Sequence, residues 1–376
     1  MKQRQTIIRI TTVPSSLKVL LRNQLKFMNK NFEVIGVSSP EKELEEVAIQ
    51  EGIKTLPVAM TRAITPFRDL ASIVRLYKIC KKHNPVIIHS HTPKAGLIGM
   101  VAGRMAGVPV RLHTVAGLPL MEATGFKRWL LETVEKFIYH FAHQVYPNSN
   151  KLADFILKNK FCSPGKIKVL GNGSSNGIDI DHFNLNPSIA EKSSSLREKL
   201  GFSADEFVFV YIGRMVRDKG ITELIDAFTL LKQEYPKAKL LLVGPFEPHL
   251  DPIPASTATA IKANPSIVHV DFQQDIRPYL GLSQALVFPS YREGFPNVPM
   301  QAGCMGLPSI VTDINGCNEI VENGVNGIIV PAKKSEPLRC AFSRASNMIK
   351  AVLKILPEPI PTPEMGVCRQ FQTPPG

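Results

Sequence analysis

The stretch from residue 291 to 320 places a carboxylate and an amide beside the start of a predicted helix. Glu293 lies in a loop after the apolar run 285–289, which predicts a buried strand, and Gln301 lies eight residues further on, in the helix expected directly after the loop. In an open α/β sheet, a loop of this kind binds anions, because free backbone N–H groups and the helix dipole both favour negative charge. The stretch therefore predicts an anion site in which Glu293 and Gln301 reach the two ends of one extended ligand.

The sequence Glu-Gly-Phe-Pro at residues 293–296, followed by a helix with an amide residue eight positions after the Glu, resembles the signature of retaining GT-B glycosyltransferases of family four. The resemblance implies that Glu293 contacts the transferred sugar and that Gln301, where the family has a second Glu, binds the ribose of a nucleotide. A Gln amide oxygen still accepts a hydrogen bond from a ribose hydroxyl, although it carries no charge. The resemblance also assigns four neighbours to donor binding: Gly294, Phe295, Pro296 and Asn297.

A second stretch, residues 213–220 with the sequence GRMVRDKG, resembles the part of the same family that holds the donor diphosphate. It follows the apolar run 207–212, a predicted strand, and precedes a helix expected from about residue 222 to residue 235. Arg214 and Lys219 match the two cations of the family. The physical reason is direct, since a nucleotide diphosphate gains charge as the sugar departs and fixed cations stabilise that charge.

The resemblance assigns two further residues, and each has a simpler alternative. His113, in the predicted strand 110–114, resembles the histidine that borders the donor diphosphate and sugar in that family; the alternative is an ordinary histidine at a strand end. Glu319 resembles the residue that opens a helix near the nucleotide; the alternative is that it only complements the dipole of its own helix. The sequence alone leaves both alternatives open.

Other pairs of potential metal ligands are weaker candidates. His89 and His91 would share one face of a strand, but no third ligand is near them in the sequence. Asp179 and Asp181 match the Asp-x-Asp of metal-dependent glycosyltransferases, yet they follow a turn instead of ending a buried strand, which favours a structural role. The six cysteines include no Cys-x-x-Cys pair, so we expect reduced thiols and no zinc finger. The expected site therefore needs no metal and no cofactor besides its nucleotide-sugar substrate.

The length of 376 residues fits two domains, because a single core rarely grows beyond about 250–300 residues. Apolar runs alternate with helical segments along the chain, which predicts α/β architecture with doubly wound parallel sheets. The resemblance implies two Rossmann-like domains that face each other across a cleft, the GT-B fold. The expected division is an acceptor-side domain at residues 1–172, a hinge at 173–182, a donor-binding domain at 183–335 and an atypical, proline-rich and partly disordered tail at 336–376.

The net charge of +13 comes entirely from the first half of the chain. Residues 1–180 contain 26 Lys+Arg against 12 Asp+Glu, whereas residues 181–376 contain 19 against 20. This asymmetry indicates that the first half faces an anionic partner. No aromatic-interleaved basic patch or known nucleic-acid motif is present, so nucleic acid is the least suitable partner.

A membrane surface suits the basic half better. In a helix expected from residue 15 to residue 29 and just beyond, four cations spaced four apart would line one face, which fits anionic lipid headgroups; a solvated helix face is the alternative. These cations are Lys18, Arg22, Lys26 and Lys30. The only tryptophan, Trp129, lies in an amphipathic helix expected at residues 127–140, and we expect it to pack in the core. With no signal peptide and no apolar run long enough to span a bilayer, we expect a cytoplasmic protein that binds peripherally to the inner face of the plasma membrane.

The resemblance implies a retaining transferase that moves a hexose or N-acetylhexosamine from a nucleotide-diphosphate sugar, UDP-linked, to a lipid-linked or polysaccharide acceptor. Such reactions build bacterial surface glycans such as capsular polysaccharide and lipopolysaccharide. No residue pair offers a covalent nucleophile with a partnered acid, so a front-face displacement is expected, in which a donor phosphate oxygen takes the acceptor proton. Two alternatives are a nucleotide-sugar epimerase of the same fold and an inactive truncated remnant, the latter suggested by the tail.

Overall fold

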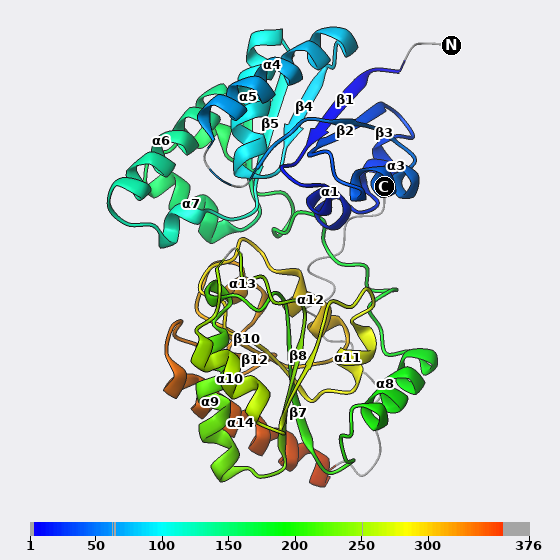
Figure 1. Ribbon diagram of the computed structural model, residues 1–376, viewed down its shortest axis with the longest axis vertical. Coiled ribbons are helices and arrows are strands. Elements are labelled where there is room, and N and C mark those ends of the chain that lie inside the picture. Colours follow the sequence, from blue (N-terminus) through cyan, green and yellow to red (C-terminus); the bar gives the residue numbers. More distant parts are fainter. Residues whose placement is uncertain (1–3, 62, 64, 250, 356–376) are drawn as a thin grey trace. The chain divides into compact units, whose positions relative to one another are not determined.

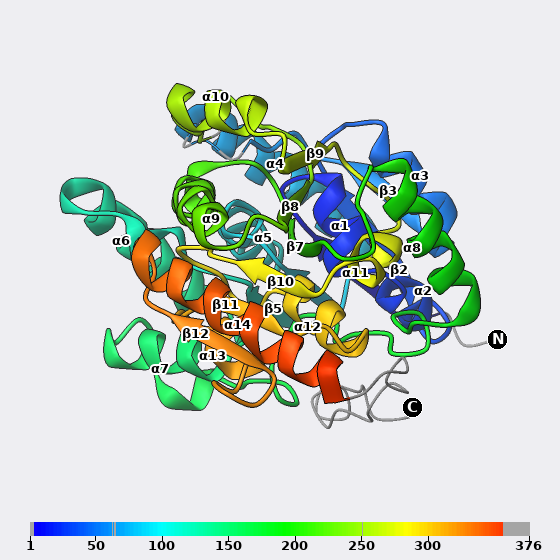
Figure 2. The same cartoon turned by 90° about the horizontal axis from the view of Figure 1, so that it is seen from below.

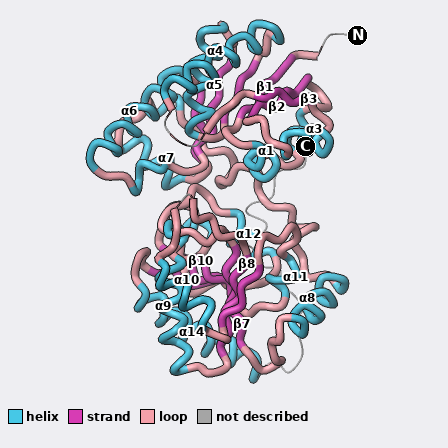
Figure 3. Tube along the Cα trace, in the orientation of Figure 1, coloured by secondary structure: helices cyan, strands magenta, loops and turns pink. Residues whose placement is uncertain are grey.

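The chain folds into two compact units, Met1–Asn176 and Gly177–Gly376. The structure, a computed structural model, describes residues 4–61, 63, 65–249 and 251–355, with side chains described up to residue 346 (Figure 1). Each unit contains one six-stranded sheet, and every strand pair in both sheets is parallel. Parallel strands need crossover helices, which cover both faces of each sheet (Figure 3). The predicted fold of two doubly wound parallel-sheet domains is therefore confirmed, while the proposed boundaries and the hinge at 173–182 stay a prediction.

The first unit has the strand order β3-β2-β1-β4-β5-β6. Its strands are β1 (Thr6–Ile10), β2 (Glu33–Ser38), β3 (Lys54–Pro57), β4 (Ile87–Ser90), β5 (Val110–Val115) and β6 (Gln144–Pro147). Its helices are α1 (Pro14–Leu20), α2 (Gln24–Met28), α3 (Glu43–Glu51), α4 (Pro66–His83), α5 (Pro93–Ala106), α6 (Gly125–Phe141) and α7 (Asn150–Lys158), with 3-10 turns η1 (Pro119–Glu122) and η2 (Pro164–Lys166). From β1 to β3 the strands are added toward one edge of the sheet, and from β4 to β6 they are added toward the other edge. The helices of the two halves therefore lie on opposite faces of the sheet.

One face of the first sheet is covered by α4, α5 and α6, which pack side by side in that order (Figure 1). Their inward side chains share one core with the sheet, to which Leu76, Ile98 and Ile138 contribute. The opposite face carries α1 and α3, whose Leu17 and Val47 belong to a separate, smaller core. The three-helix layer thus has one buried side and one side that faces away from the sheet.

The helix expected around residues 15–29 is two helices, because a residue with a left-handed backbone conformation interrupts it. Asn23 has φ 65°, in the left-handed region that Asn tolerates better than most residues, and it separates α1 from α2. The prediction of one basic stripe along a single helix is therefore wrong. Lys18 instead pairs with Glu46 of α3 at 2.8 Å, and Arg22 lies in the turn between the two helices.

Two further expectations about side chains differ from the structure. Trp129, expected in the core, is 59% exposed, because α6 turns a different face toward the sheet. Cys80, Cys162, Cys317 and Cys340 are free thiols, as expected. Cys304 is disulfide-bonded, so the expectation of reduced thiols fails at that position.

The second unit has the strand order β12-β11-β10-β7-β8-β9. Its strands are β7 (Phe207–Ile212), β8 (Ala238–Val243), β9 (Ile267–Val270), β10 (Ala285–Phe288), β11 (Ser309–Thr312) and β12 (Gly327–Val330). Its helices are α8 (Pro187–Lys199), α9 (Ile221–Glu234), α10 (Ala255–Ala263), α11 (Arg277–Gly281), α12 (Asn297–Cys304), α13 (Cys317–Ile320) and α14 (Ser335–Ile355), with the 3-10 turn η3 (Arg217–Lys219). α9 and α14 pack against each other, and Figure 2 shows α14, in orange to red, running beside β11 and β12. Because β7 and β10 are neighbours at the centre of the sheet, the loops that follow them lie next to each other.

The segment after residue 335 begins with α14, which packs against α9. Phe342 is fully buried, and its ring lies 4.5 Å from that of Phe209 and 6.4 Å from that of Phe228, measured between centroids. The start of the predicted tail therefore completes the core of the second unit. The proline-rich residues 356–376, for which partial disorder was expected, lie outside the described residues. Among the described helices, none is long and apolar enough to cross a bilayer.

Candidate active site

The loops after β7 and β10 approach each other closely at Gly220. Gly220 has φ 70°, and a Cβ atom there would clash with the backbone carbonyl of Pro289. Glycine is needed for both reasons, since it adopts the left-handed region without strain and leaves room for the second loop. The motif residues 213–220 and 291–297, which are far apart in the sequence, are brought together in this way.

Lys219 and Glu293 form an ion pair across these two loops. Both side chains are only 16% exposed, so the pair is largely shielded from water. Ser290 donates its hydroxyl to the same carboxylate at 2.8 Å, and Asn315 donates its side-chain N–H to the backbone carbonyl of Glu293. The carboxylate and the ammonium predicted from separate motifs therefore occupy one site, and the loop that carries Glu293 is fixed from two sides.

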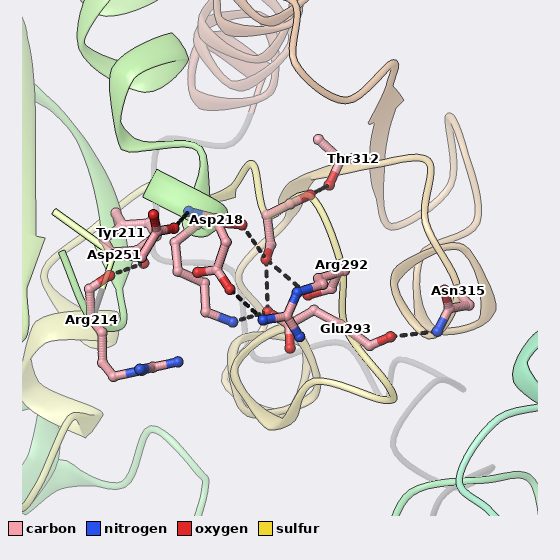
Figure 4. Close-up of polar contacts among 10 residues, drawn as sticks. Tyr211, Arg214, Asp218, Asp251, Arg292, Glu293, Thr312 and Asn315 are labelled. Carbon is pink, nitrogen blue, oxygen red and sulfur yellow. Dashed lines mark hydrogen bonds and ion pairs between the residues drawn. The ribbon is translucent and has the colours of Figure 1, made fainter. Parts of the chain in front are cut away.

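Asp218 ties the same two loops together a second time. Its carboxylate accepts a hydrogen bond from the Arg292 guanidinium at 2.8 Å, and its backbone carbonyl accepts from the N–H of Tyr291 at 2.9 Å. Its own N–H donates to Asp251 at 2.8 Å. Tyr291 in turn donates its hydroxyl to Glu223 of α9 at 2.6 Å. Figure 4 shows Asp218, Arg292 and Glu293 within one connected set of contacts.

Arg214 lies at the end of β7, as predicted, but its partner is Glu247, at 2.8 Å. The Tyr211 hydroxyl donates to the backbone carbonyl of Arg214 at 2.9 Å, which fixes the start of the loop. Burial disfavours the charge on Arg214, yet the hydrogen bond and ion pair with Glu247, helped by Asp218, raise the pKa of the guanidinium above its usual value. Arg214 and Lys219 are thus held by two different carboxylates.

The predicted donor-binding residues after Glu293 form the turn that opens α12. Pro296 is the N-cap of this helix, Phe295 is buried in the core, and Gln301 is half-buried in the second turn. Gly316, with φ 80°, packs so closely on Gly294 that a Cβ atom would clash with its backbone carbonyl. The loop before α13 therefore rests directly on the Glu-Gly-Phe-Pro turn.

Glu319 lies in the first turn of α13. Its carboxylate accepts a hydrogen bond from the backbone N–H of Gly316 at 3.4 Å. This contact closes the amino end of its own helix, which is the simpler of the two roles considered for Glu319. Its assignment to nucleotide binding stays a prediction.

His113 belongs to the first unit and is buried within β5. Its Nδ1 atom lies 2.8 Å from the Ser90 hydroxyl, and the ring packs so closely on Gly96 that a Cβ atom there would lie 2.6 Å from Cε1. Burial lowers the pKa of His113 to about 3, so the imidazole is neutral at physiological pH. A neutral, fixed imidazole can exchange a hydrogen bond with a ligand but adds no positive charge.

The weaker metal candidates have other partners. His91 Nε2 accepts a hydrogen bond from the Arg9 guanidinium at 3.0 Å, and His89 Nε2 lies 2.8 Å from the Thr114 hydroxyl. Asp179 accepts from the backbone N–H of His182 at 3.0 Å, the contact of a local turn. Over the described part of the chain, no group of three or more His, Cys, Asp or Glu side chains gathers as a metal site would require.

Sequence reasoning missed four residues that hold the site: Asp218, Glu247, Asp251 and Arg292. Their contacts join positions 33 or 74 residues apart. Only the order of the strands brings such positions together, so residue spacing carries no signal for them. The one available signal was that each of these residues is charged and lies in a loop that follows a predicted strand.

Comparisons with known proteins agree with this architecture. Residues 206–347 match the family model "Glycosyl transferases group 1", and residues 32–173 match the model "Glycosyl transferase 4-like domain". The chain is 37% identical to the capsular polysaccharide biosynthesis glycosyltransferase CapM of Staphylococcus aureus over 87% of this chain and 83% of the relative. It is 31% identical to an Escherichia coli UDP-Gal:alpha-D-GlcNAc-diphosphoundecaprenol alpha-1,3-galactosyltransferase over 77% of this chain and 73% of the relative.

Solved structures show the same fold. Anabaena Alr3699/HepE in complex with UDP-glucose superimposes with a TM-score of 0.73 at 20% identity, covering 93% of this chain and 91% of the other. A glycosyltransferase from Rickettsia africae superimposes with a TM-score of 0.74 at 20% identity, covering 98% and 93%. At this identity the likeness concerns the arrangement of the backbone.

Proposed function

Since this chain belongs to the glycosyltransferase family that includes CapM, we propose that it is a retaining enzyme that uses a UDP-linked hexose or N-acetylhexosamine and a lipid-linked saccharide acceptor. Two relatives support the acceptor class, because the names of the Escherichia coli enzyme and of a 27% identical Campylobacter jejuni enzyme specify diphosphoundecaprenol-linked sugars. The name of the former also specifies a UDP-linked donor. The product would be part of a bacterial surface glycan such as capsular polysaccharide or lipopolysaccharide.

The observation that carries the proposal is the ion pair between Lys219 and Glu293. It brings together an ammonium, which we assign to the diphosphate, and a carboxylate, which we assign to sugar hydroxyls, and parallel sheets of this kind bind ligands at this carboxyl edge. Arg214 would be the second cation for the diphosphate. Gln301 and Glu319 would lie toward the ribose and the nucleotide, with the turn 294–297 between the sugar and the helix.

In the proposed reaction the acceptor hydroxyl attacks from the face that the diphosphate leaves. The donor phosphate oxygen takes the acceptor proton, and Arg214 and Lys219 stabilise the charge that builds up on the leaving diphosphate. We propose that no metal ion is required, since the two cations take the part that a metal has in other phosphate sites. His113 would contribute a neutral hydrogen bond near the sugar. The anomeric configuration of the product, measured by NMR, tests the retaining outcome.

Replacement of Lys219 by Ala tests the assignment. We expect sugar transfer, measured as UDP release in the presence of acceptor, to fall about 100-fold or more, because a fixed charge that stabilises the leaving group is lost. The matched control is Lys237→Ala, which removes an exposed lysine that pairs with Asp205 at 2.5 Å in the same unit. Full activity in the Lys219 variant, with an unchanged circular dichroism spectrum, would contradict the proposed role.

Two alternatives are less well supported. A nucleotide-sugar epimerase has the same fold, and one structural neighbour, a Listeria monocytogenes putative UDP-N-acetylglucosamine 2-epimerase, superimposes with a TM-score of 0.61 at 16% identity. Because the sequence relatives above are glycosyltransferases, the epimerase is not favoured. Isomerisation of the donor without any acceptor would favour it. An inactive remnant would release no UDP from any donor.

The proposed acceptor is anchored in a membrane, so we propose that the protein binds peripherally to the inner face of the plasma membrane. The surplus of Lys and Arg in residues 1–180 supports this location, since the inner leaflet of a bacterial membrane is anionic. The basic stripe expected on a single first helix does not exist. We therefore propose that another surface of the first unit provides the contact.

A further inference from the structure

The outward face of α4 carries large apolar side chains in a row. Phe67 is 91% exposed, Leu70 is 60% exposed, and Val74 follows on the same side. Their spacing of three and four residues places them along one face of the helix. Leu76 and Cys80 point to the opposite side and are buried in the core. The exposed row is therefore additional to the face that holds α4 on the sheet.

Aromatic side chains lie on the outward face of α6 as well. Phe126 is 75% exposed and its ring stacks on that of Trp129, with 5.5 Å between the centroids. Phe137, further along the same helix, is also exposed. Trp at the boundary of a bilayer is favourable, because its ring is apolar and its N–H remains near water.

The two rows belong to one layer of helices. α4 packs against α5, and α5 packs against α6, on the same face of the first sheet (Figure 1). Near its carboxyl end, α5 contributes the exposed Met105. We call the outward side of this layer the three-helix surface.

The three-helix surface is positively charged. The basic residues that reach solvent are, on α4, Arg68, Arg75, Lys78, Lys81 and Lys82; on α5, Arg104; and on α6, Lys127, Arg128 and Lys136. The acids of these helices are buried or paired, since Asp69 is buried and binds Lys94, Glu132 pairs with Arg128 at 2.8 Å, and Glu135 is buried. Within these three helices no exposed, unpaired carboxylate offsets the Lys and Arg side chains.

We propose that the three-helix surface docks on an anionic lipid bilayer, with Phe67, Leu70, Phe126 and Trp129 inserted at the level of the headgroups. Exposed aromatic and aliphatic side chains surrounded by Lys and Arg fit this partner, because apolar insertion and attraction to anionic lipid act together. A second copy of the chain fits poorly, since two surfaces of the same sign would repel each other. The inference rests on the proposed function in one respect, because a lipid-linked acceptor requires the enzyme at a membrane.

The single tryptophan makes the proposal testable in the full-length protein without donor or acceptor. Trp129 lies in the surface, so vesicles of phosphatidylglycerol and phosphatidylcholine should shift its emission to shorter wavelength, and lipids with brominated acyl chains should quench it. Vesicles of phosphatidylcholine alone should bind much more weakly, and added salt should weaken binding to the anionic vesicles. An emission spectrum that no vesicle changes would overturn the proposal.

Variants identify the surface. F67S/L70S should lower the partition coefficient for anionic vesicles at least about tenfold, because two exposed apolar side chains no longer insert. The control is Ile49→Ser on α3, at the other face of the sheet, where Ile49 is 82% exposed; its binding should equal that of the wild type. Equal binding by F67S/L70S and wild type would overturn the proposal, as would a dimer in sedimentation that F67S/L70S dissociates.

The transfer assay separates this proposal from the proposed function. Transfer to a detergent-solubilised acceptor without vesicle binding would refute the docking surface and leave the enzymatic proposal standing. Vesicle binding without transfer to any acceptor would refute the enzymatic proposal and leave the docking surface standing.

Discussion

At the scale of single residues, the site of the second unit holds its cations in advance of any ligand. Arg214, Lys219 and Arg292 each pair with a carboxylate from another part of the chain. A diphosphate that binds here must take over at least one of these pairs, so part of its electrostatic gain offsets the loss of Glu293 or Glu247 as a partner. The ion pairs keep the cations in position, and breaking one of them lowers the net free energy that a diphosphate gains on binding.

The sequence identified Arg214, Lys219 and Glu293 because they stand at fixed places in two motifs. It did not identify Asp218 or Glu247, which are not distinguished by type or spacing from other acids in loops. Their importance comes from contacts that form only when β7, β8 and β10 lie side by side. The residues proposed to act on a ligand were therefore easier to find in the sequence than the residues that hold them in position.

A residue in the first unit should make stability depend on pH. Glu135 on α6 is buried, and burial raises the pKa of its carboxyl to about 7. Between the unfolded and the folded pKa, the folded state binds more protons than the unfolded state, so the free energy of unfolding should fall as pH rises toward 7 and stay low above it. The total loss is up to about 3 kcal/mol, at about 1.4 kcal/mol per pH unit.

Urea unfolding at several values between about pH 5 and about pH 8 measures this effect. We expect Glu135→Gln to remove it, so that the stability of the variant relative to wild type increases with pH. The buried histidines titrate in both proteins, and their contribution cancels in the difference. A pH-independent difference between the two proteins would contradict a raised pKa for Glu135.

At the scale of elements, the site exists because two loops follow neighbouring strands. Alternating apolar runs and helical segments predicted the sheets and the helix after each strand. The break between α1 and α2 escaped prediction, because the left-handed Asn23 leaves the apolar pattern of the leucines unchanged. The exposure of Trp129 escaped for a related reason: α6 has apolar residues on more than one side, and periodicity alone does not say which side meets the sheet.

Close packing between loops gives a test at this scale. Gly316→Ala introduces a Cβ atom where Gly294 and Phe295 leave no room, at φ 80°. Gly324→Ala is the matched control, because Gly324 has φ 84° and nothing lies within 4 Å of its added Cβ atom. Both variants should lose about 1–2 kcal/mol in the free energy of unfolding from backbone strain. Only Gly316→Ala should also weaken UDP binding, since it displaces the turn 294–297; equal UDP binding by the two variants would contradict this account.

At the scale of the whole molecule, the two halves of the chain differ in net charge, and the two proposed partners, a membrane surface and a nucleotide sugar, are assigned to different halves. The surplus of positive charge lies in the first half, whose three-helix surface is the proposed membrane contact, while the second half is nearly neutral and holds the proposed donor site. The charge asymmetry was visible in the sequence, but the helices that carry the basic surface were not. The predicted stripe fell on α1 and α2, whereas the structure has cations together with exposed aromatic rings on α4 and α6.

The most direct test of the central claim is a comparison of UDP and UMP binding by calorimetry, with wild type and Lys219→Ala. If Lys219 and Arg214 bind the diphosphate, UDP should bind wild type more tightly than UMP does, and the substitution should weaken UDP about tenfold or more while changing UMP little. Equal affinities of wild type for UDP and UMP, or a UDP affinity that Lys219→Ala leaves unchanged, would contradict the claim that the second unit grips a nucleotide diphosphate through these cations.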